Sequence, residues 1–292
     1  MSNAMNQPVC ALTGANGYVG SAIRRSLEAS GMRTVPLVRS PGTDGISWTL
    51  DSASGLAGEL RARGVTALVH SAWDMKGVKP AAYRRTNLDG SRRLFDEAAS
   101  AGIRNVIFIS TISAFDTAVS LYGRTKLETE KAASQIDALS IRPGLVWGDS
   151  PGGAFGSIEK TVRGANFVPL IGSGEYPQYL VHEDDLGRAV TRGLAENWQN
   201  QNPGPMTIAN PEMWRFRDLV LACAARLGRS VKLVSVPWRA VYLALKAAEA
   251  AGVKLSFRSD SVLSLVNQNQ NPDFGALKRF NIQVRPYPRN AG

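Results

Sequence analysis

Short apolar runs alternate with amphipathic stretches through the first half of the chain. Residues 9–12 form an apolar run, which is typical of a strand buried on both faces of a parallel sheet. Tyr18–Ala29 carries apolar residues at helical spacing and is followed by Gly31, at the place of a helix C-cap. A second buried run lies at residues 105–110. Alternating strands and helices of these lengths predict an α/β fold with a doubly wound parallel sheet.

The same patterns place further elements along the chain. Strands are expected at residues 34–38, 46–50, 67–70, 167–171, 179–181, 206–209 and 231–236. Helices are expected at residues 56–63, 81–101, 122–130, 155–162, 183–196, 216–227, 238–251 and 259–266. The elements from residue 206 onward are interpreted as a small α/β unit.

Three glycines follow the first strand at intervals of three residues. Gly14 would allow the sharp turn, Gly17 would let backbone N–H groups approach a phosphate, and Gly20 would let the helix pack closely on the strand. The N-terminus of that helix favours the negative charge of a pyrophosphate. The motif predicts a dinucleotide site, although a glycine-rich turn of an ordinary α/β domain has the same sequence pattern.

Arg39 suggests which dinucleotide binds. It ends the second strand, about twenty residues past the glycines, where an acidic residue would bind the adenosine ribose and a basic one accommodates a 2′-phosphate. Arg39 therefore favours NADP over NAD, unless it is an ordinary surface residue. The cofactor contacts expected at this end of the sheet are Gly14, Asn16, Gly17, Tyr18, Val19, Gly20, Arg39, Asp51, Ser71, Ala72 and Trp73.

These patterns predict two domains. Residues 5–165 would form a dinucleotide-binding Rossmann domain, to which residues 182–198 return. Residues 166–292 would be mainly substrate-binding. Residues 1–4 precede a second methionine and are interpreted as a remnant of added sequence.

The candidate catalytic residues come after the strand at residues 105–110. Thr111 and Ser113 come directly after it, and Tyr122 and Lys126 share one face of the next helix because they are four residues apart. A tyrosine hydroxyl has a pKa of about 10, and a neighbouring ammonium would stabilise its phenolate. An ordinary helix with one tyrosine and one exposed lysine would show the same spacing.

Taken together, these motifs resemble the extended short-chain dehydrogenase/reductase family, also called the NAD-dependent epimerase/dehydratase family. The segments that carry the resemblance lie at residues 14–20, 69–72, 87–91, 122–126, 141–148 and 181–186. The resemblance implies that Tyr122 is the catalytic acid/base, that Lys126 holds the nicotinamide ribose and lowers the tyrosine pKa, and that Thr111 binds the substrate oxygen. It also implies that Pro143 lies beneath the nicotinamide and that Ser113 and Leu145 face the substrate.

The function expected from this resemblance is an NADP-dependent oxidoreductase that interconverts a ketone and a secondary alcohol, with a nucleotide-sugar-like substrate. An NAD-dependent nucleotide-sugar 4-epimerase and a non-enzymatic dinucleotide-binding sensor are the alternatives. The 4,6-dehydratases of the family need an Asp-Glu pair after the threonine, but Ile112 and Ser113 stand there, so dehydration is rejected. The short loop between Thr111 and Tyr122, and Leu145 in place of an asparagine, weaken the nucleotide-sugar assignment.

Composition and charge narrow the function classes further. The net charge is +10, but the basic residues are scattered, which favours a solvated surface over a nucleic-acid site. No apolar run reaches the length of a membrane span. Cys10 and Cys223 are too few for a disulfide framework or a metal site. We expect a cytoplasmic enzyme for a small-molecule carbonyl or alcohol, with no metal, nucleic acid or membrane span, and a homodimer is left open.

Overall fold

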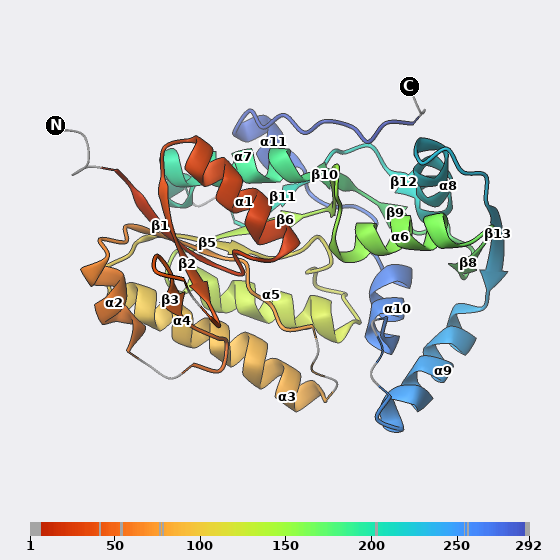
Figure 1. The fold of residues 1–292 in the computed structure, drawn as a ribbon, viewed down its shortest axis with the longest axis horizontal. Helices are drawn as coiled ribbons and strands as arrows, with labels where there is room; N and C mark the ends of the chain where they lie inside the picture. Colours follow the sequence, from red (N-terminus) through yellow and green to blue (C-terminus); the bar gives the residue numbers. More distant parts are fainter. Residues whose placement is uncertain are drawn as a thin grey trace.

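The computed structural model describes residues 7–289 except residues 41, 53–54, 76, 78, 202–203, 254 and 256. Among the described residues, seven strands pair in parallel into one large sheet: β1 (Val9–Thr13), β2 (Arg33–Val38), β3 (Ile46–Ser47), β4 (Ala67–His70), β5 (Asn105–Ile109), β6 (Leu139–Pro143) and β11 (Met206–Ile208). Their order is β11-β6-β5-β4-β1-β2-β3, so strand succession reverses between β1 and β4 (Figure 1). The predicted doubly wound parallel sheet is confirmed, and its ligand-binding edge lies at this reversal.

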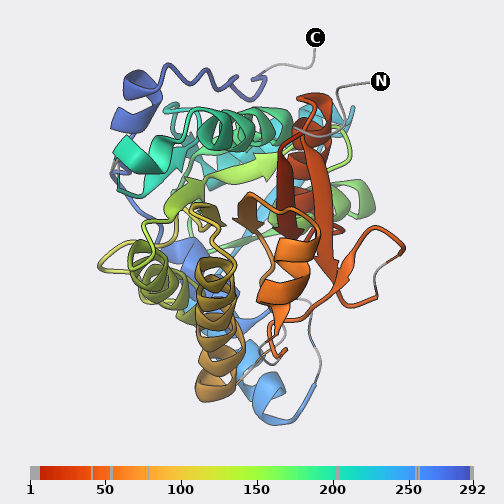
Figure 2. The same cartoon turned by 90° about the vertical axis from the view of Figure 1, so that its left-hand side faces the viewer.

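Helices cover both faces of the large sheet (Figure 2). One face carries α1 (Tyr18–Ala29) and α7 (Glu183–Ala195), which pack against each other. The other face carries α2 (Leu56–Ala62), α4 (Gly90–Ser100) and α5 (Leu121–Ser134). These two layers of helices leave the strand ends open to the loops that form the candidate site.

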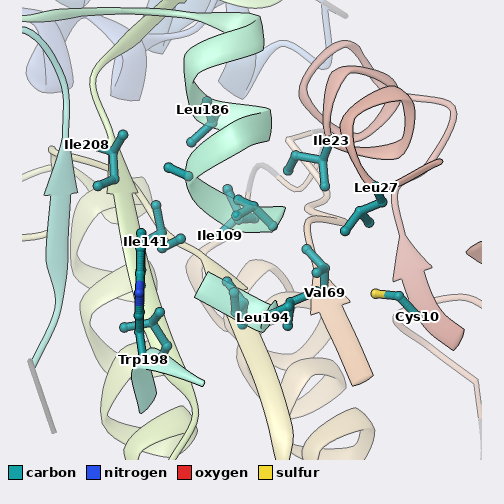
Figure 3. Packing of buried hydrophobic residues seen from close by; sticks show 14 of the residues in the cluster. Cys10, Ile23, Leu27, Val69, Ile109, Ile141, Leu186, Leu194, Trp198 and Ile208 are labelled. Atoms are coloured by element: carbon teal, nitrogen blue, oxygen red, sulfur yellow. The ribbon is translucent and has the colours of Figure 1, made fainter. Parts of the chain in front are cut away.

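The core beneath α1 and α7 joins several strands into one apolar cluster (Figure 3). Val69, Ile109 and Ile141 project from neighbouring strands toward Ile23 of α1 and Leu186 of α7, and all five are buried. Side chains alternate along a strand, so the residues between them point into a second core under α2, α4 and α5. Burial on both faces explains the continuous apolar runs in the sequence.

One expected helix has an irregular turn inside it. Residues 81–101 predict a single helix, but the chain forms α3 (Pro80–Arg84), a π-helical turn (Arg85–Asp89) and then α4. At the start of α4, a Cβ on Gly90 would clash with the Leu50 carbonyl oxygen. Turns of this π type inside helices occur often at functional sites, and this one holds a side chain of the candidate site.

The other strands in the described part of the chain form three short pairs. These pairs are β7 (Leu145–Trp147) with β10 (Leu180–His182), β9 (Pro177–Gln178) with β12 (Trp214–Arg215), and β8 (Phe167–Ile171) with β13 (Lys232–Val236). The helices that accompany them are α6 (Gly153–Gly164), α8 (Phe216–Arg226), α9 (Trp238–Ala250) and α10 (Ser259–Val266). Met206–Ile208 was expected in the smaller α/β unit, but it lies in the large sheet because it pairs with β6. The domain boundaries stay a prediction.

The segment after α10 returns to the large sheet. Here α11 (Gly275–Arg279) leads to Phe280 and Ile282, which are buried in the core beneath α1 and α7. The Phe280 ring lies 4.7 Å from the ring of Trp198. Arg192 of α7 donates hydrogen bonds to two carbonyl oxygens of the same segment, at 3.1 and 3.0 Å. Late residues of the chain therefore complete the core of the first half.

Three sequence expectations concern features of the whole molecule. Within the described residues, no helix is long and apolar enough to cross a bilayer. No group of three or more potential His, Cys, Asp or Glu ligands is found in the same part of the chain. Cys10 and Cys223 are free buried thiols.

Truncating Trp198 should lower stability strongly. Its side chain is fully buried, so Trp198→Ala is expected to reduce the free energy of unfolding by about 3–5 kcal/mol in denaturant titration. Met213→Ala is the control, because Met213 is 46% exposed and its loss should change stability by less than about 0.5 kcal/mol. Equal effects of the two substitutions would contradict the role of Trp198 in this core.

Candidate active site

The glycine turn packs backbone against backbone. Gly14 has a φ of +68°, which favours glycine, and a Cβ on it would lie 2.9 Å from the Ala72 nitrogen at the end of β4. A Cβ on Gly20 would clash with the Gly14 carbonyl. Gly17 donates to that carbonyl at 2.9 Å and is the N-cap of α1, so no N-cap side chain competes for the first N–H groups of the helix. This arrangement fits the phosphates of a dinucleotide.

A buried chain of hydrogen bonds lies behind this turn. Thr13 Oγ1 accepts from the backbone N–H groups of residues 71 and 72, each at 3.0 Å, so its own proton points to His70 Nδ1 at 2.7 Å. His70 Nε2 then donates to Ser91 Oγ at 2.8 Å, which donates to the Asn87 carbonyl at 2.6 Å. Burial lowers the pKa of His70 to about 3, so its ring is neutral. The chain ties β1, β4 and the π-helical turn together.

Asn87 holds the loop that follows β4. Its Oδ1 accepts from the Asp74 nitrogen at 2.8 Å, and its Nδ2 donates to the Asp74 carbonyl at 2.9 Å. Beside this contact, Trp73 Nε1 donates to the Tyr83 hydroxyl at 2.7 Å. The paired hydrogen bonds of Asn87 fix the backbone of this loop, and the indole contact fixes the side chain that faces α5.

Lys126 is buried on α5 and reaches the end of β5. Its Nζ donates to the Ile109 carbonyl at 2.7 Å and lies 3.9 Å from the ring centre of Trp73 and 4.6 Å from that of Phe108. Burial lowers the pKa of Lys126 to about 7, although the Glu130 carboxylate opposes this shift. The ammonium is thus held by one carbonyl and two aromatic faces, in surroundings that favour its neutral form.

Thr111, Ser113 and Tyr122 meet where β5 ends. Burial raises the pKa of Tyr122, and a side-chain hydrogen bond with Thr111 opposes this effect. The Tyr122 ring lies edge-on to the ring of Trp73, with centres 6.3 Å apart. Ser113 donates from its nitrogen to Thr111 Oγ1 at 3.2 Å, and its carbonyl would clash with a Cβ on Gly123 of α5. The structure brings these residues together, and their chemical roles stay a prediction.

A buried ion pair supports the helix that carries Lys126. Glu130, one turn further along α5, accepts from Arg142 Nε at 2.8 Å and from Arg142 Nη2 at 2.6 Å. Ser110 Oγ donates to the same carboxylate at 2.5 Å. The pair links α5 to β5 and β6, and three hydrogen bonds satisfy the buried carboxylate.

The residues expected at the adenosine end lie on the same sheet edge as the glycine turn. Arg39 is exposed directly after β2, which is parallel to β1. Asp51 is also exposed and accepts a hydrogen bond from Thr86 Oγ1 at 3.1 Å. An exposed guanidinium at this edge is able to meet a phosphate, whereas Asp51 already has a partner within the chain.

The other expected contacts differ in how accessible they are. Asn16 is exposed at the turn, whereas Tyr18 and Val19 are half-buried at the start of α1. Pro143 is buried, and its carbonyl accepts from the loop after β5 at 3.0 Å. Leu145 is half-buried against the apolar core of the second half. The contact of Leu145 with a substrate stays a prediction.

Several residues that shape the site escaped the sequence analysis. Asn87 lies in a motif that resembles the family, but nothing in the sequence predicts the π-helical turn that aims it at Asp74. His70 is part of a strand pattern that only predicts burial. Glu130 and Arg142 are 12 residues apart, so no local spacing brings them together.

Lys126 should make stability depend on pH. Its pKa falls from the ordinary value of 10.5 to about 7 on folding, so the unfolded chain binds more protons between these values and stability should rise with pH across this window. From pH 7 to pH 9 without cofactor, the wild type is expected to gain more than about 1 kcal/mol of unfolding free energy relative to Lys126→Met. Parallel pH profiles for the two proteins would contradict a buried ammonium.

Comparisons with known proteins agree with this geometry. The ceramide reductase of Caulobacter vibrioides (strain NA1000 / CB15N) is 29% identical over 246 residues, which are 78% of this chain and 74% of that protein. Two solved structures share the fold. MoeE5 in complex with UDP-glucose and NAD has 22% identity and a TM-score of 0.64 over 78% of this chain and 85% of that one. A dTDP-4-dehydrorhamnose reductase from Clostridium acetobutylicum has 18% identity and a TM-score of 0.65 over 78% and 84%.

The chain also matches the model of a protein family. The model of the NAD dependent epimerase/dehydratase family matches residues 10–209. This range includes the glycine turn, the helix with Tyr122 and Lys126, and the large sheet as far as β11. The chain therefore belongs to the NAD-dependent epimerase/dehydratase family.

Proposed function

We propose that this chain is an NADPH-dependent oxidoreductase that interconverts a ketone and a secondary alcohol. One observation carries the proposal: Thr111, Tyr122 and Lys126 are gathered at the carboxyl end of β5, two strands from the glycine turn of β1. A phenol that hydrogen-bonds a second hydroxyl, with an ammonium one helical turn away, is suited to protonating a carbonyl oxygen.

In this proposal Tyr122 is the proton donor. Burial raises its pKa, so the phenol carries its proton at neutral pH. As negative charge develops on the carbonyl oxygen, Tyr122 transfers its proton there and the Thr111 hydroxyl donates a hydrogen bond to the same oxygen. The ammonium of Lys126 would stabilise the phenolate that remains and bind the nicotinamide ribose.

The glycine turn supports binding of the dinucleotide. Its backbone contacts leave no room for a side chain at Gly14 or Gly20, and the uncapped start of α1 offers N–H groups to a pyrophosphate. When bound, the dinucleotide supplies the hydride that reduces the carbonyl carbon. The exposed guanidinium of Arg39 supports NADP as the preferred form.

Two classes of substrate are candidates. Nucleotide sugars are the first, because MoeE5 is solved with UDP-glucose and another neighbour is a dTDP-4-dehydrorhamnose reductase. A ketone with long acyl chains is the second, because a relative found by sequence is a ceramide reductase.

A substrate screen separates these classes. NADPH oxidation would be followed with 4-keto nucleotide sugars, with 3-ketoceramide in detergent micelles and with small ketones. Turnover of one class identifies the substrate. Purified protein that retains NAD and interconverts nucleotide sugars would instead favour the 4-epimerase, and the absence of turnover despite tight cofactor binding would favour the sensor.

Tyr122→Phe should abolish reduction while cofactor binding persists. Removing the proton donor is expected to lower kcat by about 10²-fold to 10⁴-fold, with the Kd for NADPH, measured by fluorescence titration, changed by less than about twofold. Tyr176→Phe, in the loop between β8 and β9, is the matched control and should keep full activity. Substantial residual turnover in Tyr122→Phe would exclude it as the donor.

Arg39→Ala should remove the preference for NADPH. Losing a charged hydrogen bond of about 1.5–3 kcal/mol is expected to reduce kcat/KM for NADPH at least about tenfold and leave the value for NADH nearly unchanged. Arg104→Ala removes the same charge from the opposite sheet edge, where Arg104 is exposed before β5. If both variants keep the wild-type NADPH/NADH ratio, Arg39 does not select the cofactor.

A further inference from the structure

The helix that carries Tyr122 and Lys126 begins against α10, a helix from much later in the chain (Figure 1). Asp260 Oδ1 accepts a hydrogen bond from the Leu121 nitrogen at 2.6 Å, and Oδ2 accepts one from the Tyr122 nitrogen at 3.0 Å. Ser120, the N-cap of α5, accepts from the next nitrogen at 3.0 Å. Two of the first three N–H groups of α5 are therefore satisfied by a carboxylate 138 or more residues away.

Arg258, the N-cap residue of α10, contacts the loop on the other side of the site. Arg258 Nη1 donates to the Met75 carbonyl at 2.9 Å and to the Gly77 carbonyl at 2.6 Å, in the loop that follows Trp73. Residues 258–260 thus contact both the catalytic helix and the loop whose indole covers Lys126. We call residues 258–260 the clasp.

The clasp also joins α10 to α9. Glu249 of α9 accepts from the Ser259 nitrogen at 2.8 Å and from Ser259 Oγ at 2.7 Å. None of the residues of α9, all of them described, is buried, and only Ser259 and Val262 are buried in α10. This hairpin therefore has little core of its own, and the polar contacts of the clasp contribute much of its attachment near the site.

We infer that Asp260 is a positioning residue for the reaction, and this inference rests on the proposed function of Tyr122. Its carboxylate fixes the backbone of Tyr122 and complements the positive end of the α5 dipole. Because the same clasp anchors α9 and α10, movement of this hairpin shifts the start of α5 and the orientation of the phenol. Asp260 thereby couples the outer half of the molecule to the proton donor.

The test compares Asp260→Asn and Asp260→Glu with Asp273→Asn. Asp273 is the matched control, because it also accepts from the nitrogen at the start of a helix (Gly275, 2.7 Å), but the helix is α11, which it precedes. Asp260→Asn is expected to lower kcat at least about tenfold with KM and the Kd for NADPH changed less than about twofold, and Asp260→Glu should restore part of the loss. Asp273→Asn should keep the wild-type kcat.

Hydrogen–deuterium exchange gives a second readout, without cofactor or substrate. Asp260→Asn should speed exchange at least about tenfold at Leu121 and Tyr122, and should also speed it at Trp73 and Asp74 across the clasp. Wild-type exchange at these four residues, or a stability loss equal to that of Asp273→Asn with kcat unchanged, would overturn the inference. If the wild type reduces no ketone, the proposed function fails but the exchange experiment still decides whether Asp260 couples the hairpin to α5.

Discussion

The candidate site depends on a hydrogen-bond chain that is closed to water. Thr13, His70 and Ser91 each donate one hydrogen bond in the same direction, and the chain ends at the Asn87 carbonyl, so that two central strands are connected to a helix. The chain is intact only while His70 is neutral, and burial keeps it so. These hydrogen bonds support the two segments that border the proposed cofactor site. The glycine turn packs on the end of β4. The loop held by Asn87 carries the indole that lies over Lys126.

The sequence predicts those elements whose determining residues lie close together along the chain. The glycine spacing, the apolar runs and the four-residue step from Tyr122 to Lys126 reflect local geometry, so the sheet and the grouping of residues at β5 follow from them. Contacts between distant segments carry no such signal. Asp260 meets Leu121 because two helices from different halves of the fold touch, and β11 joins the large sheet although its sequence resembles that of any short strand.

The large sheet and the hairpin of α9 and α10 are stabilised by different kinds of interaction. The large sheet is stabilised by two continuous apolar cores, whereas the hairpin of α9 and α10 is attached near the site by the Asp260 carboxylate and the Arg258 guanidinium. Polar contacts of this kind are directional and can be exchanged for others at modest cost. In the proposed function, the half with the large sheet holds the cofactor, and the polar attachment of the hairpin allows the start of α5 to be adjusted.

The burial of Phe280 and Ile282 affects how the chain folds while it is being synthesised. They are buried in the same core as Ile23 and Val69, although more than two hundred residues separate the two pairs along the chain. When only the first half of the chain has left the ribosome, that half therefore exposes the apolar surface that Phe280 and Ile282 would cover. Until residue 282 emerges, the core beneath α1 and α7 stays incomplete, and a premature stop near residue 270 would leave it without Phe280 and Ile282.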